Sequence, residues 1–202
     1  MNYKDIIHNV RIYDLNESLI AAGYPMRTKI QNMDEPFLKK DLERAKSLTK
    51  AVKNDNQAHG QFLTGIRVSF DLTFTNKAWV EAERYRFLEF VSSQSTMHCI
   101  TKFDIDNQYI EYTDKRMIEI MKELIKEYNE NPSSENYLKV LYSNPCGFKI
   151  TARMTTNYRC LMNIYQQRKS HRLLEWRAFC KWIKSLPFSE LITGKEVSNN
   201  ER

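Results

Sequence analysis

Hydrophobic and polar residues alternate strictly along residues 65–74. Every second position is apolar, at Ile66, Val68, Phe70, Leu72 and Phe74. Because successive side chains of a strand point to opposite faces, this period predicts a half-buried strand. The same alternation returns along residues 148–154 and predicts a second strand, which follows a turn at 144–147.

A helix is predicted directly after each of these strands. Thr75 and Asn76 can cap the first helix, whose apolar positions are Ala78, Trp79, Ala82, Leu88 and Val91. Asn157 can cap the second, because its side chain can accept a hydrogen bond from an unpaired backbone N–H. The apolar residues of this second helix recur at helical spacing, at Tyr158, Leu161, Met162 and Tyr165. A strand–helix unit therefore occurs twice, at 65–91 and 147–177.

Further helices are predicted outside these two pairs of elements. Ser170 can cap a helix in which Leu173, Trp176, Cys180 and Ile183 repeat at helical spacing. Charged amphipathic helices are predicted at 35–52 and 114–130. Weaker patterns indicate a strand at 10–13, a short helix at 16–22 and a polar turn at 53–57.

These elements together predict an α+β fold. We expect the two strand–helix units to form a mixed or antiparallel sheet packed with long helices. A helical sub-domain is expected around 36–52 and 114–130. A chain of 202 residues suits one domain, which we place at 1–193, with a disordered tail at 194–202.

Composition adds constraints on location and ligands. The formal net charge of +6 suits an anionic ligand, either a nucleotide or a nucleic acid. No apolar stretch approaches the roughly 20 residues of a membrane span, and the first residues lack a signal-peptide layout. The four cysteines form no Cys-x-x-Cys pair, so reduced thiols in a cytoplasmic protein are expected. No residue cluster has metal-ligand spacing, and no metal is expected.

The predicted helices of residues 157–183 carry an unusual density of positive charge. Five lysine or arginine residues fall between Arg159 and Arg177. Arg159 and Asn163 lie four residues apart on one helix face, and Asn157 and Arg168 share another. Two interpretations stay open from spacing alone, a solvated basic face on a core helix or a binding face for an anion.

A family resemblance bears on this choice. The pattern Thr-x-Asn-x-Arg-x-Leu-x-Asn-(x)4-Arg spans residues 155–168 and is followed by His171 and by Glu-Trp-Arg at 175–177. It resembles the C-terminal half of the flavin-dependent thymidylate synthases. The first strand–helix unit is also similar, because Arg84-Tyr85-Arg86 stands in place of the family's Arg-His-Arg and His59 lies 25 positions before Arg84. Ser93-Gln94-Ser95 takes the place of the family's Asn-Glu-x-Ser loop. The resemblance covers roughly residues 59–98 and 139–186.

The resemblance implies a set of site residues. Those implied for flavin binding are His59, Arg84, Tyr85, Arg86, Asn157, Arg159, Asn163 and His171. Those implied for the nucleotide substrate are Glu81, Arg84, Gln94, Ser95, Lys139 and Arg168, with Arg84, Ser95 and Lys139 near its phosphate. Arg168 corresponds to the catalytic arginine at the uracil edge, where a guanidinium can stabilise negative charge as it develops.

The implied activity is reductive methylation of dUMP to dTMP. The implied cofactors are FAD and NADPH, with methylenetetrahydrofolate as the carbon donor. The implied assembly is a homotetramer with active sites between subunits, and the implied partner is a nucleotide rather than a nucleic acid.

The chain also departs from the family's residues. It has Glu81 and Leu173 in place of glutamines, Tyr85 in place of a histidine, Ser93 in place of a glutamate and Met97 in place of an arginine. Two alternatives therefore stay open. One is a divergent enzyme that modifies another pyrimidine nucleotide, for example by hydroxymethylation. The other is a catalytically silent protein that binds nucleotides or nucleic acid.

Overall fold

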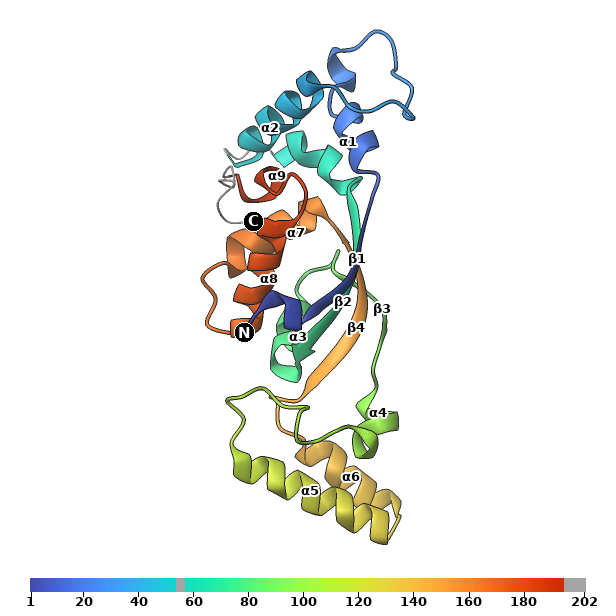
Figure 1. Cartoon of the computed structure of the whole chain (residues 1–202), viewed down its shortest axis with the longest axis vertical. Coiled ribbons are helices and arrows are strands. Elements are labelled where there is room, and N and C mark those ends of the chain that lie inside the picture. The colour runs from blue at the N-terminus through green and yellow to red at the C-terminus, as the bar shows by residue number, and fades with distance from the viewer. Residues whose placement is uncertain (54–56, 195–202) are drawn as a thin grey trace.

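A four-stranded antiparallel sheet forms the middle of the protein (Figure 1). The computed structural model describes residues 1–53 and 57–194. The strand order is β1-β2-β4-β3, with bounds Ile7–Tyr13 for β1, Arg67–Thr75 for β2, Lys149–Asn157 for β4 and Glu89–Ser93 for β3. The predicted α+β class and the antiparallel sheet are confirmed. The predicted polar turn at 53–57 and the predicted tail fall on residues 54–56 and 195–202, outside the described residues.

The two central strands are the two that the sequence predicts most clearly. β2 and β4 pair along their whole length, from Arg67 opposite Asn157 to Thr75 opposite Lys149. The apolar residues of β2 are fully buried on one face, at Val68, Phe70, Leu72 and Phe74. The polar residues between them are more exposed and lie on the other face. The period of two in the sequence is therefore the period of burial.

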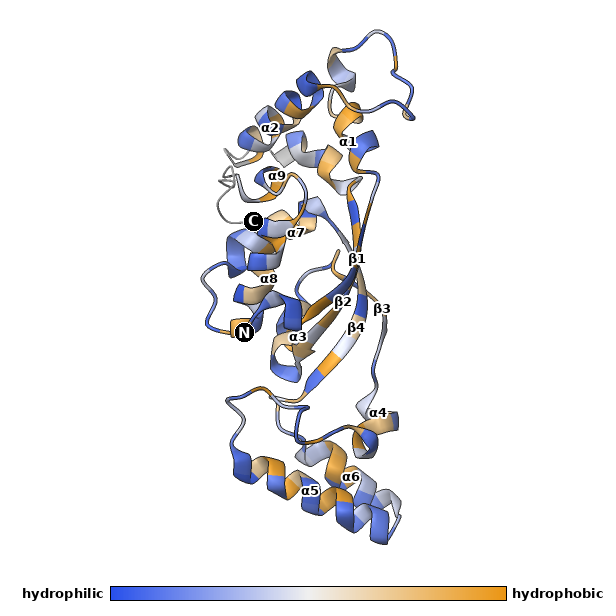
Figure 2. Ribbon diagram, in the orientation of Figure 1, coloured by the Kyte–Doolittle hydropathy of each residue, from blue (hydrophilic) through white to orange (hydrophobic). Residues whose placement is uncertain are grey.

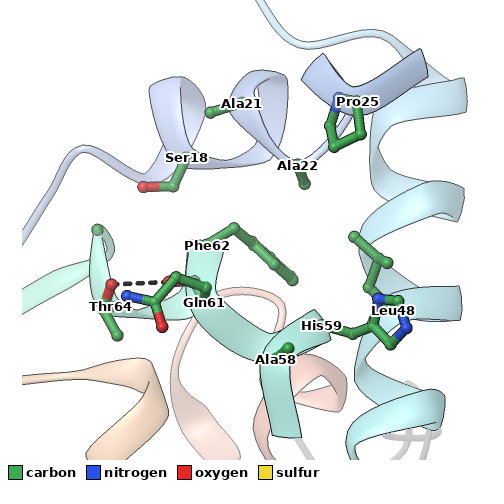
Figure 3. A pocket seen from close by; sticks show the side chains of 11 residues that line it. Ser18, Ala21, Ala22, Pro25, Leu48, Ala58, His59, Gln61, Phe62 and Thr64 are labelled. Carbon is green, nitrogen blue, oxygen red and sulfur yellow. Dashed lines mark hydrogen bonds between the residues drawn. The ribbon is translucent and has the colours of Figure 1, made fainter. Parts of the chain in front are cut away.

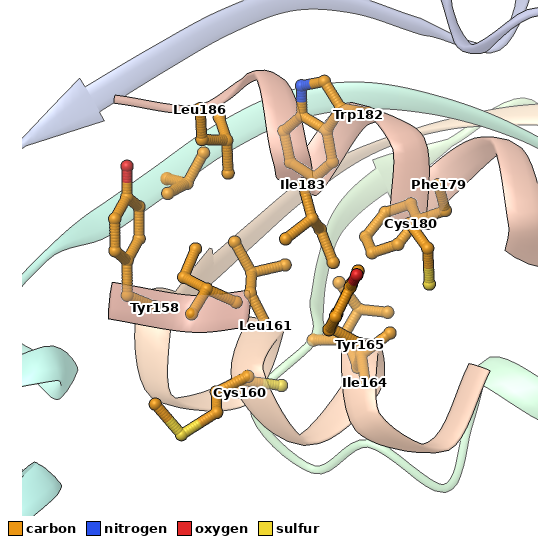
Figure 4. Close-up of a cluster of buried hydrophobic side chains, with 14 of the residues drawn as sticks. Tyr158, Cys160, Leu161, Ile164, Tyr165, Phe179, Cys180, Trp182, Ile183 and Leu186 are labelled. Carbon is orange, nitrogen blue, oxygen red and sulfur yellow. The ribbon is translucent and has the colours of Figure 1, made fainter. Parts of the chain in front are cut away.

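Helices from the C-terminal third cover the buried face of the sheet. They are α7 (Tyr158–Arg168) and α8 (Leu174–Ser185), and α3 (Asn76–Ala82) packs beside them (Figure 1). Figure 4 shows apolar side chains of α7 and α8 pointing toward one another. Between these helices and the sheet, the rings of Phe70, Phe74, Trp176, Phe179 and Trp182 have centroids 4.6–6.0 Å apart. This aromatic cluster is the centre of the main core.

Separate groups of helices lie at the two ends of the sheet (Figure 1). One end carries α1 (Leu15–Ala21), α2 (Lys39–Lys53), the 3₁₀ helix η3 (Gln57–Thr64) and α9 (Glu190–Thr193). The other carries α4 (Thr96–Cys99), α5 (Lys115–Glu130) and α6 (Ser134–Ser143). Short 3₁₀ turns complete the described chain at Tyr3–Asp5, Tyr24–Met26 and Ile100–Lys102.

The prediction of one helical sub-domain built from 36–52 and 114–130 is wrong. α2 buries Ala45 and Val52 in the main core, whereas α5 buries Met121 and Ile125 in a second, smaller core. Figure 2 shows apolar and polar residues alternating along α5, as its amphipathic sequence requires. Amphipathic spacing predicts each helix but does not say which apolar surface will cover it.

The predicted helix over residues 76–91 is also wrong in its second half. α3 ends at Ala82, a turn follows in which Tyr85 donates its N–H to the carbonyl of Ala82, and residues 89–93 form β3. Phe90 pairs with Met154 of β4, and its ring lies 4.8 Å from that of Trp79. The exposed edge of β4 offers backbone partners that helical spacing cannot reveal, so tertiary pairing outweighs local pattern.

The start of α8 differs from the prediction as well. Its N-cap is Leu173, and Ser170 lies in the preceding turn. The Nδ1 atom of His171 accepts the N–H of Leu173 at 3.2 Å, so an imidazole rather than a serine hydroxyl binds the backbone at this helix start. In contrast, Asn157 caps α7 as predicted and accepts the Cys160 N–H at 2.9 Å. α6 has no counterpart among the predicted elements.

The cysteines differ in exposure. Cys160 and Cys180 are buried, Cys99 is half-buried and Cys146 is exposed, and all four are free thiols. Within residues 1–53 and 57–194, no helix combines the length and the apolar character that crossing a membrane would require.

Replacing Phe74 by alanine tests the central position of the aromatic cluster. Phe74 is fully buried and contacts Trp79, Trp176 and Phe179. The Phe74→Ala variant should lose about 3–5 kcal/mol of unfolding free energy, measured by chemical denaturation, because a large cavity forms. Tyr142→Ala is the control, since Tyr142 is 86% exposed and should change stability by no more than about 0.5 kcal/mol. Similar losses in both variants would contradict the assignment of the core.

Candidate functional site

Arg168 is a buried arginine at the end of α7. It is 7% exposed, although an arginine is rarely buried without partners. Its Nε donates to the hydroxyl of Tyr85 at 2.8 Å and its Nη1 donates to Oε2 of Glu81 at 2.8 Å. The guanidinium carbon lies 4.9 Å from the ring centroid of Trp176. We call Glu81, Tyr85, Arg168, His171 and Trp176 the Arg168 cluster.

The sheet brings the members of this cluster together. Because β2 and β4 are antiparallel, the helices that follow them, α3 and α7, begin at opposite ends of the strand pair. α7 then runs back along the sheet for 11 residues, which is about 16 Å at 1.5 Å per residue. Its last residue therefore reaches α3, which supplies Glu81, and the turn after α3, which supplies Tyr85.

The negative charge of Glu81 lies against the positive charge of Arg168. Burial alone would raise the pKa of Glu81, but the hydrogen bond from Lys77 and the charges of His171 and Arg168 outweigh it, so this pKa lies below its ordinary value. Burial raises the pKa of Tyr85 despite the bond from Arg168. Tyr85 is therefore a neutral phenol, which accepts from Arg168 and donates to Oε1 of Gln167 at 2.9 Å.

His171 completes the cluster from the turn between α7 and α8. Its Nε2 lies 3.2 Å from Oε2 of Glu81 and 2.8 Å from Nη1 of Arg168. Its Nδ1 accepts the Leu173 N–H, which leaves Nε2 facing Glu81 and Arg168. The histidine and the arginine therefore meet at one carboxylate oxygen of Glu81.

A second group of predicted residues lies near the start of α7. The Oδ1 atom of Asn157 is used for capping, and Asn163 is exposed on α7. Arg159 packs against Gly60 of η3, where a Cβ atom would lie 2.3 Å from Nη1 of the arginine. His59, also in η3, lines a cavity of about 420 Å³ between η3, α1 and α2 (Figure 3).

The remaining predicted residues lie elsewhere. Arg84 and Arg86 are exposed on the turn between α3 and β3. Gln94 exchanges two hydrogen bonds with the backbone of Thr151, through its own N–H and through Oε1. Ser95 precedes α4 and makes no capping bond with its side chain. Lys139 of α6 pairs with Glu127 at 3.4 Å and with Glu135 at 3.6 Å.

The predicted site residues therefore fall into several groups within one chain. Glu81, Tyr85, Arg168 and His171 contact one another. The residues of α7 and η3, which we call the α7–η3 group (His59, Asn157, Arg159 and Asn163), do not join them, and neither do the residues around α4 and α6. Sequence reasoning missed the stacking of Trp176 under Arg168 and the buried bond from Thr75 to Glu175, at 2.6 Å. The Glu-Trp-Arg motif at 175–177 was the sequence feature that could have indicated these contacts. Helical spacing, however, identifies Trp176 only as a core position.

The described residues offer no metal site. In the part of the chain that the structure describes, no group of three or more His, Cys, Asp or Glu side chains could hold a metal ion.

Solved structures share the fold of this chain. Two structures of flavin-dependent thymidylate synthase ThyX from Helicobacter pylori, both with FAD and dUMP, have TM-scores of 0.70 and 0.68 and identities of 15% and 16%. The matches cover 94% and 92% of this chain and 98% of each ThyX chain. A UMP/dUMP methylase, PolB from Streptomyces cacaoi bound with 5-Br dUMP, has a TM-score of 0.61 at 12% identity, with 89% of this chain and 88% of that chain covered.

These similarities are structural. No protein-family model and no curated protein matches the sequence. The chain nevertheless has the fold of the flavin-dependent thymidylate synthases over nearly its whole described length. The resemblance stated from the sequence motifs is confirmed at the level of the fold.

Replacing Arg168 tests the cluster itself. Arg168→Ala should lower the unfolding free energy by about 1.5–3 kcal/mol, because charge-assisted hydrogen bonds to Glu81 and Tyr85 are lost. Arg168→Lys should recover only part of this, since an ammonium lacks the planar fork and the stacking surface. Arg172→Ala, on an exposed neighbour, should stay within about 0.5 kcal/mol. The unfolding free energies are measured by denaturant titration. If Arg168→Ala is as stable as Arg172→Ala, the buried network does not exist in solution.

Proposed function

We propose that this protein is a flavin-dependent enzyme that methylates a pyrimidine deoxynucleotide. In its specific form the proposal is the conversion of dUMP to dTMP, with methylenetetrahydrofolate as carbon donor and NADPH as reductant. The observation that carries it is the Arg168 cluster, a preorganised guanidinium set in a fold shared with enzymes solved with dUMP or 5-Br dUMP.

The residues of the chain suit the proposed roles. Arg168 is held in one orientation by Tyr85, Glu81 and Trp176, so it costs little reorganisation when charge develops on a nearby ring. Arg84 directly precedes Tyr85 in the sequence. It is exposed and can donate to a phosphate. In this proposal Gln94, Ser95 and Lys139 contact the nucleotide of another subunit's site.

The donor set also fits a flavin dinucleotide. A pyrophosphate needs cations and amide donors, and the chain offers Arg84, Arg86, Arg159 and Asn163. Arg84 and Asn163 are both exposed, so a ligand can reach their side chains. When bound, FAD would supply the hydride, while His59, Tyr85, Asn157 and His171 would orient it.

A second candidate is an enzyme of the same fold that acts on another pyrimidine nucleotide. Glu81 favours it, because its carboxylate neutralises Arg168, where the resemblance places a glutamine. A catalytically silent nucleotide-binding protein is the outcome if ligands bind without turnover.

Flavin loading and product formation test this proposal. Reconstituted with FAD, the protein should show flavin absorbance after gel filtration and should convert dUMP to dTMP when both cosubstrates are present, detected by mass spectrometry. Arg84→Ala should weaken FAD binding about tenfold or more, because a charge-assisted contact is worth about 1.5–3 kcal/mol. Lys181→Ala, on exposed α8 surface, is the control. Absence of bound flavin in the parent protein would refute the enzyme proposal.

The proposal includes a homotetramer. Its support is a set of exposed apolar side chains on the consecutive elements α3, the turn after it, β3 and α4, namely Val80, Phe87, Phe90, Val91 and Met97. β3 is an edge strand, and its outer side offers unpaired backbone groups. Exposed apolar patches of this kind commonly mark protein–protein contacts. A second copy would cover them and bring the separate groups of site residues together.

Light scattering tests the assembly. The parent should have the mass of four chains at micromolar concentration with FAD present. Val91→Glu should shift it to smaller species, because Val91 is 64% exposed on β3 and a charge there opposes apolar burial. Tyr142→Glu places the same charge on α6, where Tyr142 is 86% exposed, and should leave the mass unchanged. A monomeric parent would contradict the proposed assembly.

A further inference from the structure

Positive charge is concentrated in one stretch of the chain, residues 158–189. This stretch holds seven lysine and arginine residues and a single acidic residue, Glu175. Since the whole chain has a formal net charge of +6, the rest of it carries as many acidic as basic residues. Glu175 is 2% exposed and its Oε1 accepts the Thr75 hydroxyl, so this carboxylate lies inside the protein.

Five of these cations form one surface. We call Lys169, Arg172, Arg177, Lys181 and Lys184 the basic surface, and all five are exposed. Lys169 and Arg172 lie in the turn between α7 and α8, on the side of these helices away from the sheet (Figure 1). The other three follow at intervals of four and three residues, so they share one face of α8 and span about 10 Å.

Another solvated helix of this protein has a different distribution of charge. α5 carries charges of both signs, and these pair with one another, as Lys122 does with Glu119 at 3.0 Å and Lys126 with Glu130 at 3.8 Å. α8 has no exposed acidic side chain, because Glu175 is its only one. Like charges four residues apart destabilise a helix slightly, so this density of one sign favours an anionic partner.

The basic surface has no exposed apolar anchor. α8 buries Trp176, Phe179, Trp182 and Ile183, and residues 158–194, all of which the structure describes, expose no large apolar side chain. A helix that lies on a membrane needs apolar residues that enter the bilayer beside its basic ones. A protein interface commonly has aromatic or aliphatic anchors at its centre. Neither partner suits a surface that offers only charge and hydrogen-bond donors.

A nucleic-acid duplex suits such a surface. Its phosphates are regularly spaced negative charges, and the lysine and arginine residues that neutralise them supply most of the sequence-independent affinity. Ser170 and Ser185 are exposed next to these cations, and their hydroxyls can also donate to phosphate oxygens. Single strands fit less well, because proteins bind them by stacking bases on exposed aromatic side chains, which the basic surface lacks.

We propose that the basic surface binds the phosphate backbone of a nucleic-acid duplex without reading its sequence. This goes beyond the proposed function and does not depend on it, since none of the five cations belongs to the Arg168 cluster or to the residues proposed for flavin and nucleotide. The exposed apolar residues proposed for subunit contact, from Val80 to Met97, also lie outside the basic surface.

The salt dependence of binding tests this proposal. The association constants of the full chain with fluorescent DNA and RNA duplexes of about 20 base pairs are measured by anisotropy, at about 50 to 200 mM NaCl. The logarithm of the constant should fall against the logarithm of salt concentration with a slope of about −3 to −4.5, because each neutralised phosphate contributes about −0.9. A duplex of unrelated sequence should bind equally well, since phosphates carry no sequence information. The tighter of the DNA and RNA complexes identifies which duplex the surface fits.

Two variants and a control locate the binding. Arg177→Ala and Lys184→Ala should each make the slope shallower by about 0.9, and the double variant by about twice as much, because each removes one phosphate contact. Lys126→Ala removes one charge from α5, where the Lys126 side chain is 76% exposed, and should leave the slope as in the parent.

Several results would overturn the proposal. If Lys126→Ala flattens the slope as much as Arg177→Ala does, the attraction comes from net charge and the basic surface is not the site. A parent that binds neither duplex at the lowest salt, or that binds a single strand of the same length more tightly, also contradicts it. Binding to vesicles of phosphatidylserine and phosphatidylcholine, but to neither duplex, would assign the surface to a membrane instead. None of these results bears on flavin binding, which is measured separately.

Discussion

The full-length antiparallel pairing of β2 with β4 is the constraint on which the rest of this structure depends. The register places Phe70 opposite Met154 and gathers the apolar residues of both strands on one face. That face must be covered, and the helices that follow the strands cover it. The same register sends α7 back along the sheet, so that its last residue reaches α3. A shift by one residue would turn the apolar side chains to the other face and remove this contact.

The Arg168 cluster shows how a buried charge is retained at that contact. Removing a guanidinium from water is costly unless hydrogen bonds and an opposite charge compensate for it. Glu81 supplies the charge, Tyr85 and His171 supply polar contacts and Trp176 supplies a stacking surface. The arginine is consequently held in one position.

The arrangement of the whole chain bears on how a site could be completed. The Arg168 cluster, the α7–η3 group and the residues of α4 and α6 are held by separate contacts, and they lie along an elongated sheet with helices at both ends (Figure 1). Phe90 and Val91 are exposed on β3, an edge strand of this sheet. A ligand as large as a flavin dinucleotide needs contacts from several elements, which a second subunit could provide across that edge.

The sequence by itself determined the elements whose pattern is local. The alternation of β2 and β4, the Asn157 cap and the apolar stripe of α7 follow from side-chain spacing and from one amide beside unpaired N–H groups. The motif residues around Arg168 likewise indicated the fold that the solved structures confirm. Tertiary structure decided what depends on distant partners. β3 forms because β4 has a free edge, α2 and α5 separate because each covers a different core, and His171 replaces Ser170 at the start of α8 because the cluster positions its ring. The pairing of Glu81 with Arg168 joins residues 87 positions apart, and only a formed sheet brings them within hydrogen-bond distance.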